Sequence, residues 1–580
     1  MINENNLIKV PTLPRFRNVP LMHDLREMIR YCADTYKDET AFIIKTKRAT
    51  KTEKAEYFYR SFIDYRNDIE DLGLGLMKYG TKGKRLAIIA KNRYEWMVSY
   101  FAQVSGLGVV VPLDKDLPSE ELRQSMIKAK VEVLVFDKDH KQVVCDALSC
   151  PELSSVTAVC MDGCDDLPFD AVAYSDIVKL GKSATVEEKE TFRNLPIDGT
   201  EMAIILFTSG TSGLAKAVML SQFNITSNCK YTLDAEDIRR GDVNMAFLPY
   251  HHTFGCTGQI MLTFAGAATV YCDGLKYIQQ NLVEYKVSDF ICVPLIIESI
   301  YKKIMATVKK QGKMKKLETG MKISKLLLKL GIDKRRQLFK DIHDQLGGAV
   351  RYVISGASPL DPVVAEFYKA IGMEVFQGYG MTETSPVIAS EGYKCTCPGT
   401  IGRGIPATEV AILNPNEEGI GELIARGPGV MLGYYEAPEL TKEAIEDGWI
   451  HTGDLVCLTE NQMIKICGRS KNVIVLKNGK NVYPEELETL ISNIPYVKEC
   501  MVYGEEKNGT DDVIVAVKVV YMEDAFEGKS VEEINATVKS DIEKINDTVP
   551  AYKRINSITV TDTEMEKTTT GKVKRYKQFH

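Results

Sequence analysis

Short apolar runs alternate with amphipathic segments along most of this chain. Runs typical of buried strands occur at residues 85–90, 131–136, 246–248, 268–271, 290–293 and 352–354. Residues 119–130 have helical spacing, and the Pro118-Ser119 pair at their start favours the beginning of a helix. Strands that alternate with helices usually form parallel sheets, so the pattern predicts an α/β fold with mostly parallel sheets.

The pattern changes close to Gly468. Beyond it, residues 473–476, 501–503 and 513–521 are predicted strands, and residues 484–491 and 531–545 are predicted helices. Together they make an αβ module of roughly 110 residues, which is a usual domain size. The whole chain, at 580 residues, is too long for one core. We therefore predict a large N-terminal domain of several subdomains at 1–468 and a small C-terminal αβ domain at 469–580.

A loop rich in hydroxyl groups follows one predicted strand. The apolar run ends at Phe207, residues 208–213 read Thr-Ser-Gly-Thr-Ser-Gly, and Lys216 precedes a new apolar segment. Glycines let the backbone close around a ligand, while N–H groups, hydroxyls and a lysine supply donors and charge for phosphates. The spacing differs from the G-x-x-x-x-G-K-[ST] loop, because Ala217 follows the lysine. We interpret the segment as a flexible phosphate-binding loop, with a solvated turn as the alternative.

Four further segments carry groups suited to a nucleotide. Residues 377–386 contain two glycines, a tyrosine whose flat face suits a base, and Glu383, a hard carboxylate suited to Mg²⁺. Asp454 follows a glycine, and a lone carboxylate there suits the paired hydroxyls of a ribose. Residues 468–488 and 568–575 are rich in lysine, glycine and polar side chains. Each segment alone is weak evidence, since such residues usually form solvated surface.

In this order, the five segments resemble the adenylate-forming acyl-CoA synthetases, a family that includes luciferases and the adenylation domains of peptide synthetases. The resemblance extends from about Leu25 to the end of the chain. It implies that the enzyme uses ATP and Mg²⁺ to convert a carboxylic acid to acyl-AMP, with loss of pyrophosphate. The acyl group then passes to the thiol of coenzyme A, after rotation of a mobile C-terminal domain.

The resemblance also implies a role for each matching residue. The phosphate loop is Thr208, Ser209, Gly210, Thr211, Ser212, Gly213 and Lys216. The residues that flank the adenine are Gly356, Ala357, Ser358, Gln377, Gly378 and Tyr379. The ribose is held by Asp454 with Arg469, and the α-phosphate and Mg²⁺ by Thr382 and Glu383. His252 lies next to the acyl carboxylate, Lys572 binds that carboxylate and the α-phosphate during adenylation, Lys471 is the hinge, and Gly479 lines the pantetheine tunnel.

Two positions depart from the family pattern. Proline usually precedes the loop lysine, and this chain has Ala215 there. Because proline fixes φ, we expect a looser loop that has lost no ligand atom. Proline and a basic residue usually precede the C-terminal lysine, where residues 565–568 here read Met-Glu-Lys-Thr. Neither departure removes a charged catalytic group.

The predicted substrate is a long-chain fatty acid, because residues 302–340 resemble the lysine-rich insertion of long-chain fatty acyl-CoA synthetases. The small residues at 255–258 have two interpretations: an open apolar tunnel for an alkyl chain, or a helix packed closely on the sheet. A carrier protein is the alternative acceptor, since acidic carrier proteins suit the same basic segment. A catalytically silent lipid-binding or scaffold homologue is a third hypothesis, and retention of the charged residues named above argues against it.

Charge and cysteine usage limit the remaining classes. The net charge of -6 argues against a nucleic-acid partner. The 14 cysteines lack zinc or disulfide spacing, and the N-terminus has no basic region before an apolar one, which together predict a cytoplasmic protein with reduced thiols. Residues 302–340 combine many lysines with apolar residues at helical spacing. This pattern predicts either a solvated basic face or peripheral contact with the inner membrane face.

Overall fold

The computed structural model describes residues 2–48, 53–208, 215–506, 512–567, 573 and 575. The chain divides into two compact units. The small unit contains Met1–Lys9, Ala411–Ile424 and His451–His580, and the large unit contains Val10–Val410 and Ala425–Ile450. The domain boundary at residue 468 stays a prediction.

The first sheet of the large unit has eight strands in the order β20-β10-β9-β5-β4-β6-β7-β8. Neighbours from β9 to β8 are parallel, and β20, β10 and β9 are antiparallel. The strands are β4 (Leu86–Ile89), β5 (Val110–Pro112), β6 (Val133–Phe136), β7 (Thr157–Cys160), β8 (Val172–Ala173), β9 (Met202–Thr208), β10 (Lys216–Ser221) and β20 (Gly433–Tyr434). The apolar runs of β4, β5 and β6 are buried on both faces, as is usual for strands covered by helices on each side.

The second sheet of the large unit has nine strands in the order β17-β16-β15-β14-β13-β11-β12-β2-β3. The six strands from β15 to β2 are parallel. The strands are β2 (Thr40–Lys47), β3 (Glu56–Ser61), β11 (Val243–Ala246), β12 (Ala268–Tyr271), β13 (Asp289–Cys292), β14 (Tyr352–Ser355), β15 (Glu374–Gly380), β16 (Val387–Ser390) and β17 (Arg403–Gly404). These two sheets confirm the predicted α/β fold with mostly parallel sheets.

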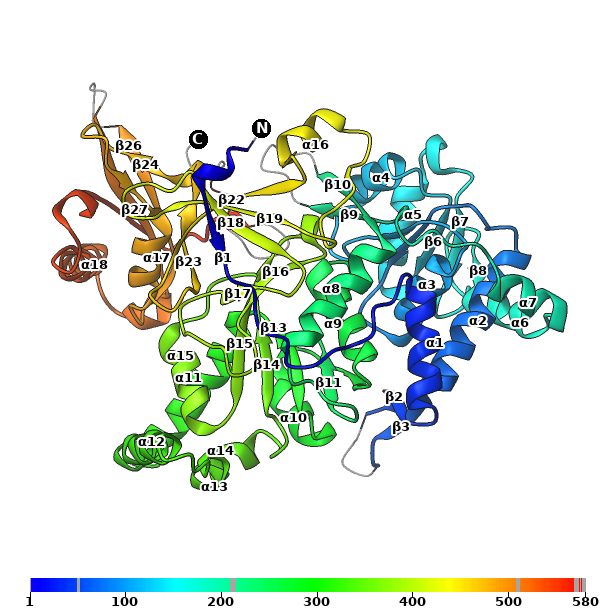
Figure 1. Ribbon diagram of the computed structural model, residues 1–580, viewed down its shortest axis with the longest axis horizontal. Coiled ribbons are helices and arrows are strands. Elements are labelled where there is room, and N and C mark those ends of the chain that lie inside the picture. Colours follow the sequence, from blue (N-terminus) through cyan, green and yellow to red (C-terminus); the bar gives the residue numbers. More distant parts are fainter. Residues whose placement is uncertain are drawn as a thin grey trace. The chain divides into compact units, whose positions relative to one another are not determined.

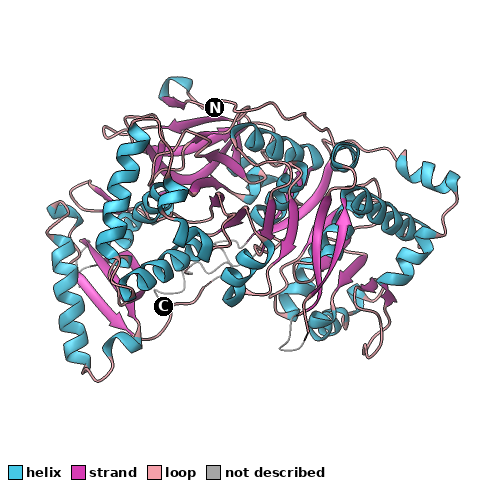
Figure 2. Cartoon of the chain, turned by 90° about the horizontal axis from the view of Figure 1, so that it is seen from below, coloured by secondary structure: helices cyan, strands magenta, loops and turns pink. Residues whose placement is uncertain are grey.

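Helices flank the strands of the large unit, as Figures 1 and 2 show. They are α1 (Leu25–Tyr36), α2 (Phe62–Lys78), α3 (Tyr94–Val104), α4 (Ser119–Lys128), α5 (Lys141–Leu148), α6 (Tyr174–Lys182), α7 (Val186–Arg193), α8 (Gln222–Ala235), α9 (Thr253–Phe264), α10 (Ile278–Tyr285), α11 (Pro294–Lys310), α12 (Met314–Lys329), α13 (Arg335–Leu338), α14 (Lys340–Gln345), α15 (Pro362–Ile371) and α16 (Pro438–Ala444). On one face of the first sheet, Leu122 of α4 and Val144 of α5 join Ala87 and Leu134 in a core.

One predicted strand is displaced from its observed position. The apolar run at 246–248 predicts a strand there, whereas β11 ends at Ala246. The structural reason is a hydrogen bond from another loop: Asn92 Nδ2 donates to the carbonyl oxygen of Leu248 (2.6 Å). The N–H of Tyr250 donates in turn to Asn92 Oδ1 (3.1 Å). The backbone after Ala246 is therefore held by a side chain from the β4–α3 loop.

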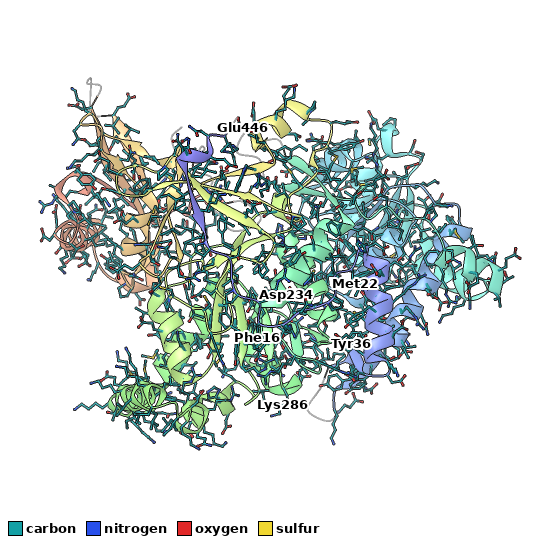
Figure 3. The ribbon with its side chains drawn as sticks, viewed as in Figure 1. Phe16, Met22, Tyr36, Asp234, Lys286 and Glu446 are labelled. Carbon is teal, nitrogen blue, oxygen red and sulfur yellow. The ribbon has the colours of Figure 1, made fainter. Side chains whose placement is uncertain are left out.

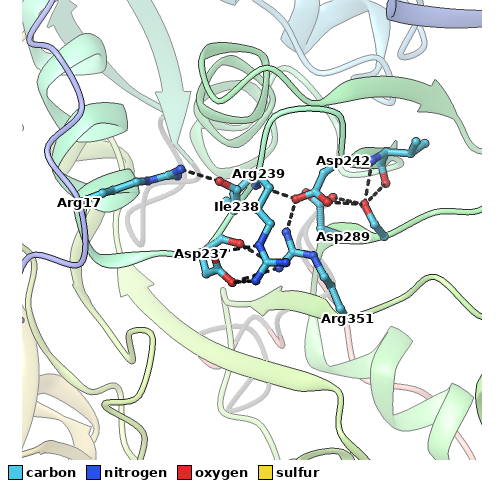
Figure 4. A network of polar contacts seen from close by, with 9 residues as sticks. Arg17, Asp237, Ile238, Arg239, Asp242, Asp289 and Arg351 are labelled. Atoms are coloured by element: carbon cyan, nitrogen blue, oxygen red, sulfur yellow. Dashed lines mark hydrogen bonds and ion pairs between the residues drawn. The ribbon is translucent and has the colours of Figure 1, made fainter. Parts of the chain in front are cut away.

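Polar contacts hold the N-terminal segment and the loop before β11 against the second sheet (Figure 4). Arg17 Nη1 donates to the carbonyl oxygen of Ile238 (2.6 Å). Arg351, just before β14, donates to the carbonyl oxygen of Asp237 (2.8 Å) and pairs with the carboxylate of Asp242. These contacts join segments that are far apart in sequence, and they satisfy charged groups that would be costly to bury alone.

Asp234, at the end of α8, holds the extended N-terminal segment marked in Figure 3 by Phe16 and Met22. Its carboxylate is fully buried and accepts from the N–H of Val19 (2.8 Å). The N–H of Phe16 donates to its backbone oxygen (2.6 Å). The ammonium group of Lys230, one helical turn earlier, lies 2.6 Å from the carboxylate, so a buried cation and a buried anion neutralise one another.

The small unit contains β22 (Trp449–Leu458, shared with the large unit), β23 (Ile464–Arg469), β24 (Ile474–Val475), β25 (Asn481–Val482), β26 (Val497–Glu506), β27 (Val513–Tyr521), β28 (Ser557–Thr561), α17 (Pro484–Ser492) and α18 (Val531–Asn546). Strands β1 (Leu7–Val10), β18 (Glu409–Leu413) and β19 (Gly421–Arg426) also have residues in both units, and β21 (Ile445–Glu446) lies in the large unit. Leu487, Val517 and Val538 belong to a fully buried core. The predicted strand at 501–503 is longer in the structure, because β26 pairs with β27 along its whole length.

Within the described ranges, none of the helices combines the length and the apolar character needed to cross a lipid bilayer.

We predict that Asp234→Ala destabilises the protein by about 3–5 kcal/mol, because it leaves the buried ammonium group of Lys230 without its partner. The matched control is Lys442→Ala, which breaks the exposed pair of Lys442 with Glu439 and should cost less than about 1 kcal/mol. Urea and thermal unfolding measure both variants. Equal losses in the two variants would show that Asp234 contributes no more than a surface charge.

Candidate functional site

The two ends of the predicted phosphate loop are fixed by a pair of strands. Thr208 is the last residue of β9 and pairs directly with Lys216, the first residue of β10. Residues 209–213, predicted to contact the phosphates, lie outside the described residues. The carbonyl oxygen of Ala215 accepts a hydrogen bond from Lys128 Nζ (2.7 Å). The pairing therefore places a hydroxyl and a cation side by side, where β9 ends and β10 begins.

Tyr434 brings Lys216 and Glu383 together. Its hydroxyl donates to Glu383 Oε1 (2.8 Å), and the ammonium nitrogen of Lys216 lies 4.9 Å from the centre of its ring. Tyr434 is the last residue of β20, which pairs with β10, and the N–H of Met431 donates to the backbone oxygen of Glu383 (2.9 Å). Burial, followed by the charge of Glu383, raises the pKa of Tyr434, so the phenol stays protonated and remains a donor.

Glu383 fits the predicted Mg²⁺ role. The residue lies in a 3₁₀ turn, Thr382–Thr384, and is 8% exposed. One oxygen accepts from Tyr434, and no described residue donates a hydrogen bond to the other oxygen, Oε2. A carboxylate whose orientation is fixed through one oxygen can present the second oxygen to a hard cation.

The segments predicted to flank the adenine lie on neighbouring strands of the second sheet. Gly356 follows β14, and Ser355 pairs with Gln377 of β15. The N–H of Gly356 donates to the carbonyl oxygen of Cys292 (3.1 Å). Ala357 has a φ of 71°, a left-handed conformation that is uncommon for a residue other than glycine. Such strain often accompanies a functional loop.

Gln377 has a supporting role in this structure. Its side-chain oxygen accepts from the N–H of Leu360 (3.0 Å), which fixes the loop after Gly356. Its own N–H donates to Glu391 Oε2 (2.9 Å). Burial raises the pKa of Glu391 to about 7, and the hydrogen bonds from Gln377 and Cys397 oppose that rise. These contacts make Glu391 a positioning residue that the sequence pattern did not indicate.

His252 immediately precedes α9, in the loop that Asn92 holds. Its ring lies 4.2 Å, centre to centre, from the ring of His251, and His251 Nε2 lies 3.2 Å from Asp114 Oδ1. Burial and then the proximity of His252 lower the pKa of His251 to about 3, so its imidazole is neutral near pH 7. His252 was predicted from sequence, whereas His251 and Asp114 were not.

The small residues after His252 pack α9 closely on its neighbours. A Cβ atom on Gly258 would lie 2.5 Å from the Cδ1 atom of Ile291, and one on Gly255 would lie 2.2 Å from the carbonyl oxygen of Pro249. A methyl group would therefore clash at both positions. Of the two interpretations of this segment, the structure favours close packing over an open tunnel at these glycines.

In the small unit, the predicted ribose-binding pair is formed. Asp454 of β22 pairs directly with Arg469 of β23, and Arg469 Nε lies 2.7 Å from Asp454 Oδ1. The carboxylate is 7% exposed and the guanidinium is 45% exposed. The hydroxyl of Thr452 accepts from the N–H of Asp454 (3.1 Å). The arginine therefore fixes the orientation of a nearly buried carboxylate.

The structure describes two of the three other predicted residues of the small unit. Lys471 is in a short 3₁₀ turn after β23. Gly479 has a φ of 75° in the turn between β24 and β25, and a Cβ atom there would lie within 4 Å of no atom of the described residues. Lys572 lies outside the described residues.

The chain belongs to the AMP-binding enzyme family. The family model for the AMP-binding enzyme matches residues 29–435, and that for the AMP-binding enzyme C-terminal domain matches residues 471–580.

Two of the similar curated proteins have names that refer to long-chain acids. "Long chain acyl-CoA synthetase 6, peroxisomal" of Arabidopsis thaliana is 31% identical over 475 residues, which cover 77% of this chain and 66% of that protein. "Long-chain-fatty-acid--CoA ligase FadD15" of Mycobacterium bovis is 28% identical over 483 residues, covering 80% of this chain and 77% of that protein.

Solved structures share the fold at lower identity. An anthranilate CoA ligase, AuaEII, in complex with anthranoyl-AMP has a TM-score of 0.74 at 18% identity, covering 97% of each chain. A Mycobacterium tuberculosis fatty acyl CoA synthetase has a TM-score of 0.65 at 20% identity, covering 96% of this chain and 98% of that chain. These similarities confirm the α/β fold with a large N-terminal domain and a small C-terminal domain.

We predict that Tyr434→Phe weakens Mg²⁺-dependent ATP binding about tenfold or more, because a hydrogen bond to a charged group contributes about 1.5–3 kcal/mol. Calorimetric titration with ATP at several Mg²⁺ concentrations measures the effect. The matched control is Tyr435→Phe, since the Tyr435 ring lies 4.7 Å from Arg85 and phenylalanine keeps that contact. An equal change in both variants would contradict a specific role for the Tyr434 hydroxyl.

Proposed function

We propose that this chain is an AMP-forming fatty acid:CoA ligase, with long-chain acids as its main substrates. It converts the acid and ATP to acyl-AMP and pyrophosphate, and it transfers the acyl group to coenzyme A with release of AMP. The observation that carries the proposal is the contact of Tyr434 with both Lys216 and Glu383. In that cluster a cation of the predicted phosphate loop, Lys216, and an oriented carboxylate, Glu383, share one neighbour. The names of the similar proteins from Arabidopsis thaliana and Mycobacterium bovis support the choice of acid and acceptor.

Electrostatic repulsion is the main obstacle in the first step, because a carboxylate must approach the polyphosphate of ATP. Lys216 contributes positive charge at the phosphates, and Lys572 contributes it between the attacking carboxylate and the α-phosphate. Glu383 holds Mg²⁺, which neutralises phosphate charge when it is bound. His252 contacts the acyl carboxylate, and Asp454 with Arg469 holds the ribose hydroxyls.

A carrier protein remains the second candidate acceptor. The observation in its favour is the set of exposed lysines between residues 302 and 340, which suits an acidic partner. Separate acceptor assays distinguish the two: acyl-AMP formed by the enzyme is mixed with coenzyme A in one assay and with an acyl carrier protein in the other. Transfer to the carrier protein alone would replace the ligase assignment.

The test of the reaction is acid-dependent exchange of pyrophosphate into ATP, with long-chain fatty acids, acetate and benzoate compared. We expect the largest exchange with long-chain acids. Lys572→Ala should lower that exchange at least about a hundredfold but spare thioester formation from supplied acyl-AMP, because the cation is needed where charge develops in adenylation. Lys574→Ala is the matched control. Exchange independent of fatty acid would contradict the function, and equal loss of both half-reactions would contradict the role of Lys572.

The same protein also binds reversibly to anionic membranes through α12. Its fatty acid substrates partition into those membranes. The inward face of α12 contains buried Leu317 and Ser324, whose hydroxyl donates to the carbonyl oxygen of Ala370 in α15 (2.8 Å). On the opposite face Leu326 is 60% exposed, and Leu330, the residue that directly follows α12, is 67% exposed. Exposed lysines flank these leucines and form no ion pair among the described residues: Lys315, Lys316, Lys322, Lys325 and Lys329. Leucines bordered by lysines suit the interface of an anionic lipid surface.

We predict that the protein co-sediments with anionic vesicles and not with neutral ones, and that high salt releases it. Changing Leu326 and Leu330 together to serine should weaken binding about tenfold or more, since each buried leucine contributes about 1.5–3 kcal/mol. Leu275→Ser is the matched control, because Leu275 is 64% exposed elsewhere on the large unit. Absence of binding to anionic vesicles at low salt, or equal binding by the double variant, would end the membrane proposal.

A further inference from the structure

Three side chains that can bind a transition metal converge between the two large sheets. Asp114 follows β5 of the first sheet, and His251 and His252 follow β11 of the second sheet. One ligand atom from each side chain lies within 4.8 Å of the others. All three belong to the large unit. The cluster thus joins two loops, one at the carboxyl end of β5 and the other after the carboxyl end of β11.

His251 supplies the observation that points to a ligand. Its side chain is only 6% exposed, and Nε2 makes no hydrogen bond with any of the described residues. Nε2 nevertheless lies 3.2 Å from Asp114 Oδ1, without the alignment of a hydrogen bond. Two ligands of a tetrahedral zinc ion, each at about 2.0–2.2 Å from the metal, lie about 3.3 Å apart. The nitrogen and the oxygen are therefore spaced like two ligands of one metal ion. A metal ion would also give the buried Nε2 of His251 a partner, and a buried polar atom without a partner costs free energy.

The surrounding contacts hold these ligands in place. Asp114 Oδ1 accepts a hydrogen bond from the N–H of Asp116 (3.0 Å), which fixes the carboxylate. Asn92 binds the backbone of Leu248 and Tyr250 (2.6 and 3.1 Å), which fixes the loop just before the histidines. Supporting hydrogen bonds of this kind orient the ligands of metal sites.

We propose that Asp114, His251 and His252 form a binding site for a divalent transition metal of the zinc class. Two imidazoles and one carboxylate favour Zn²⁺ or Co²⁺ over Mg²⁺, which prefers oxygen ligands such as Glu383. Three protein ligands leave a fourth position open. His252 is also the residue assigned to the acyl carboxylate in the proposed function, so the metal and the acid compete for it. That competition rests on the proposed function, whereas metal binding itself does not.

Co²⁺ titration of the full-length protein, without nucleotide or acid, tests the site. Nitrogen and oxygen ligands give weak visible bands, and these are distinguishable from the strong near-ultraviolet bands of cobalt bound to the chain's thiolates. We expect one equivalent with nitrogen and oxygen ligands in the wild type. His251→Gln and Asp114→Asn should each weaken it at least about tenfold, a loss typical even of changes to supporting residues. Asparagine at 114 keeps an oxygen that can accept from Asp116.

The control variant is His23→Gln, which removes an exposed histidine and should bind Co²⁺ like the wild type. Circular dichroism and the thermal midpoint without metal show whether each variant folds, and Asp114→Asn decides the result if His251→Gln does not fold. Added Zn²⁺ should raise the thermal midpoint of the wild type and of His23→Gln only. Identical Co²⁺ spectra in all folded variants, or thiolate bands alone, would overturn the site. A failed pyrophosphate-exchange assay would leave this binding result unchanged, so the two proposals fail separately.

Discussion

Parallel strands end at the same edge of their sheet, and the candidate site depends on this constraint. A strand can run parallel to its neighbour only if the chain crosses back over the sheet, so the carboxyl ends of all such strands gather together. In the large unit these ends carry Asp114, Thr208, His252 and Gly356, and Glu383 follows shortly after β15. The contacts of Asn92 with Leu248 and of Asp114 with His251 show that the carboxyl edges of the two large sheets meet. Residues from distant parts of the chain therefore share one region.

Within each of the two units, side chains predicted to bind the nucleotide are oriented by a neighbouring residue. Tyr434 fixes one oxygen of Glu383, Arg469 fixes Asp454, and Glu391 supports the backbone of Gln377. A buried polar group without a partner costs free energy, so each of these side chains requires a second residue that hydrogen-bonds or pairs with it. Fixed orientation in turn keeps donors and charges in place before a substrate arrives, which is how such sites stabilise developing charge.

The large unit also shows why one histidine of a pair can be recognised from sequence and the other cannot. His252 occupies a position with a recognised pattern, and its role was expected from that pattern. The proposed role of His251 depends on its contact with Asp114, which follows a strand of the other sheet. Similarly, α12 has an ordinary amphipathic sequence, and only its contact with α15 shows that the leucines at 326 and 330 face outward.

The sequence by itself determined the α/β class, most strand and helix positions, and the motifs of an adenylate-forming enzyme, because hydrophobic period, glycines and hydroxyl-rich loops act over a few residues. Tertiary structure decided the rest. It ended β11 at Ala246 through a hydrogen bond from Asn92, and it packed Gly258 against Ile291. It also placed Tyr434 against Glu383. These contacts join residues distant in sequence, and they exist only once strand order and sheet packing are fixed, so no local pattern can encode them.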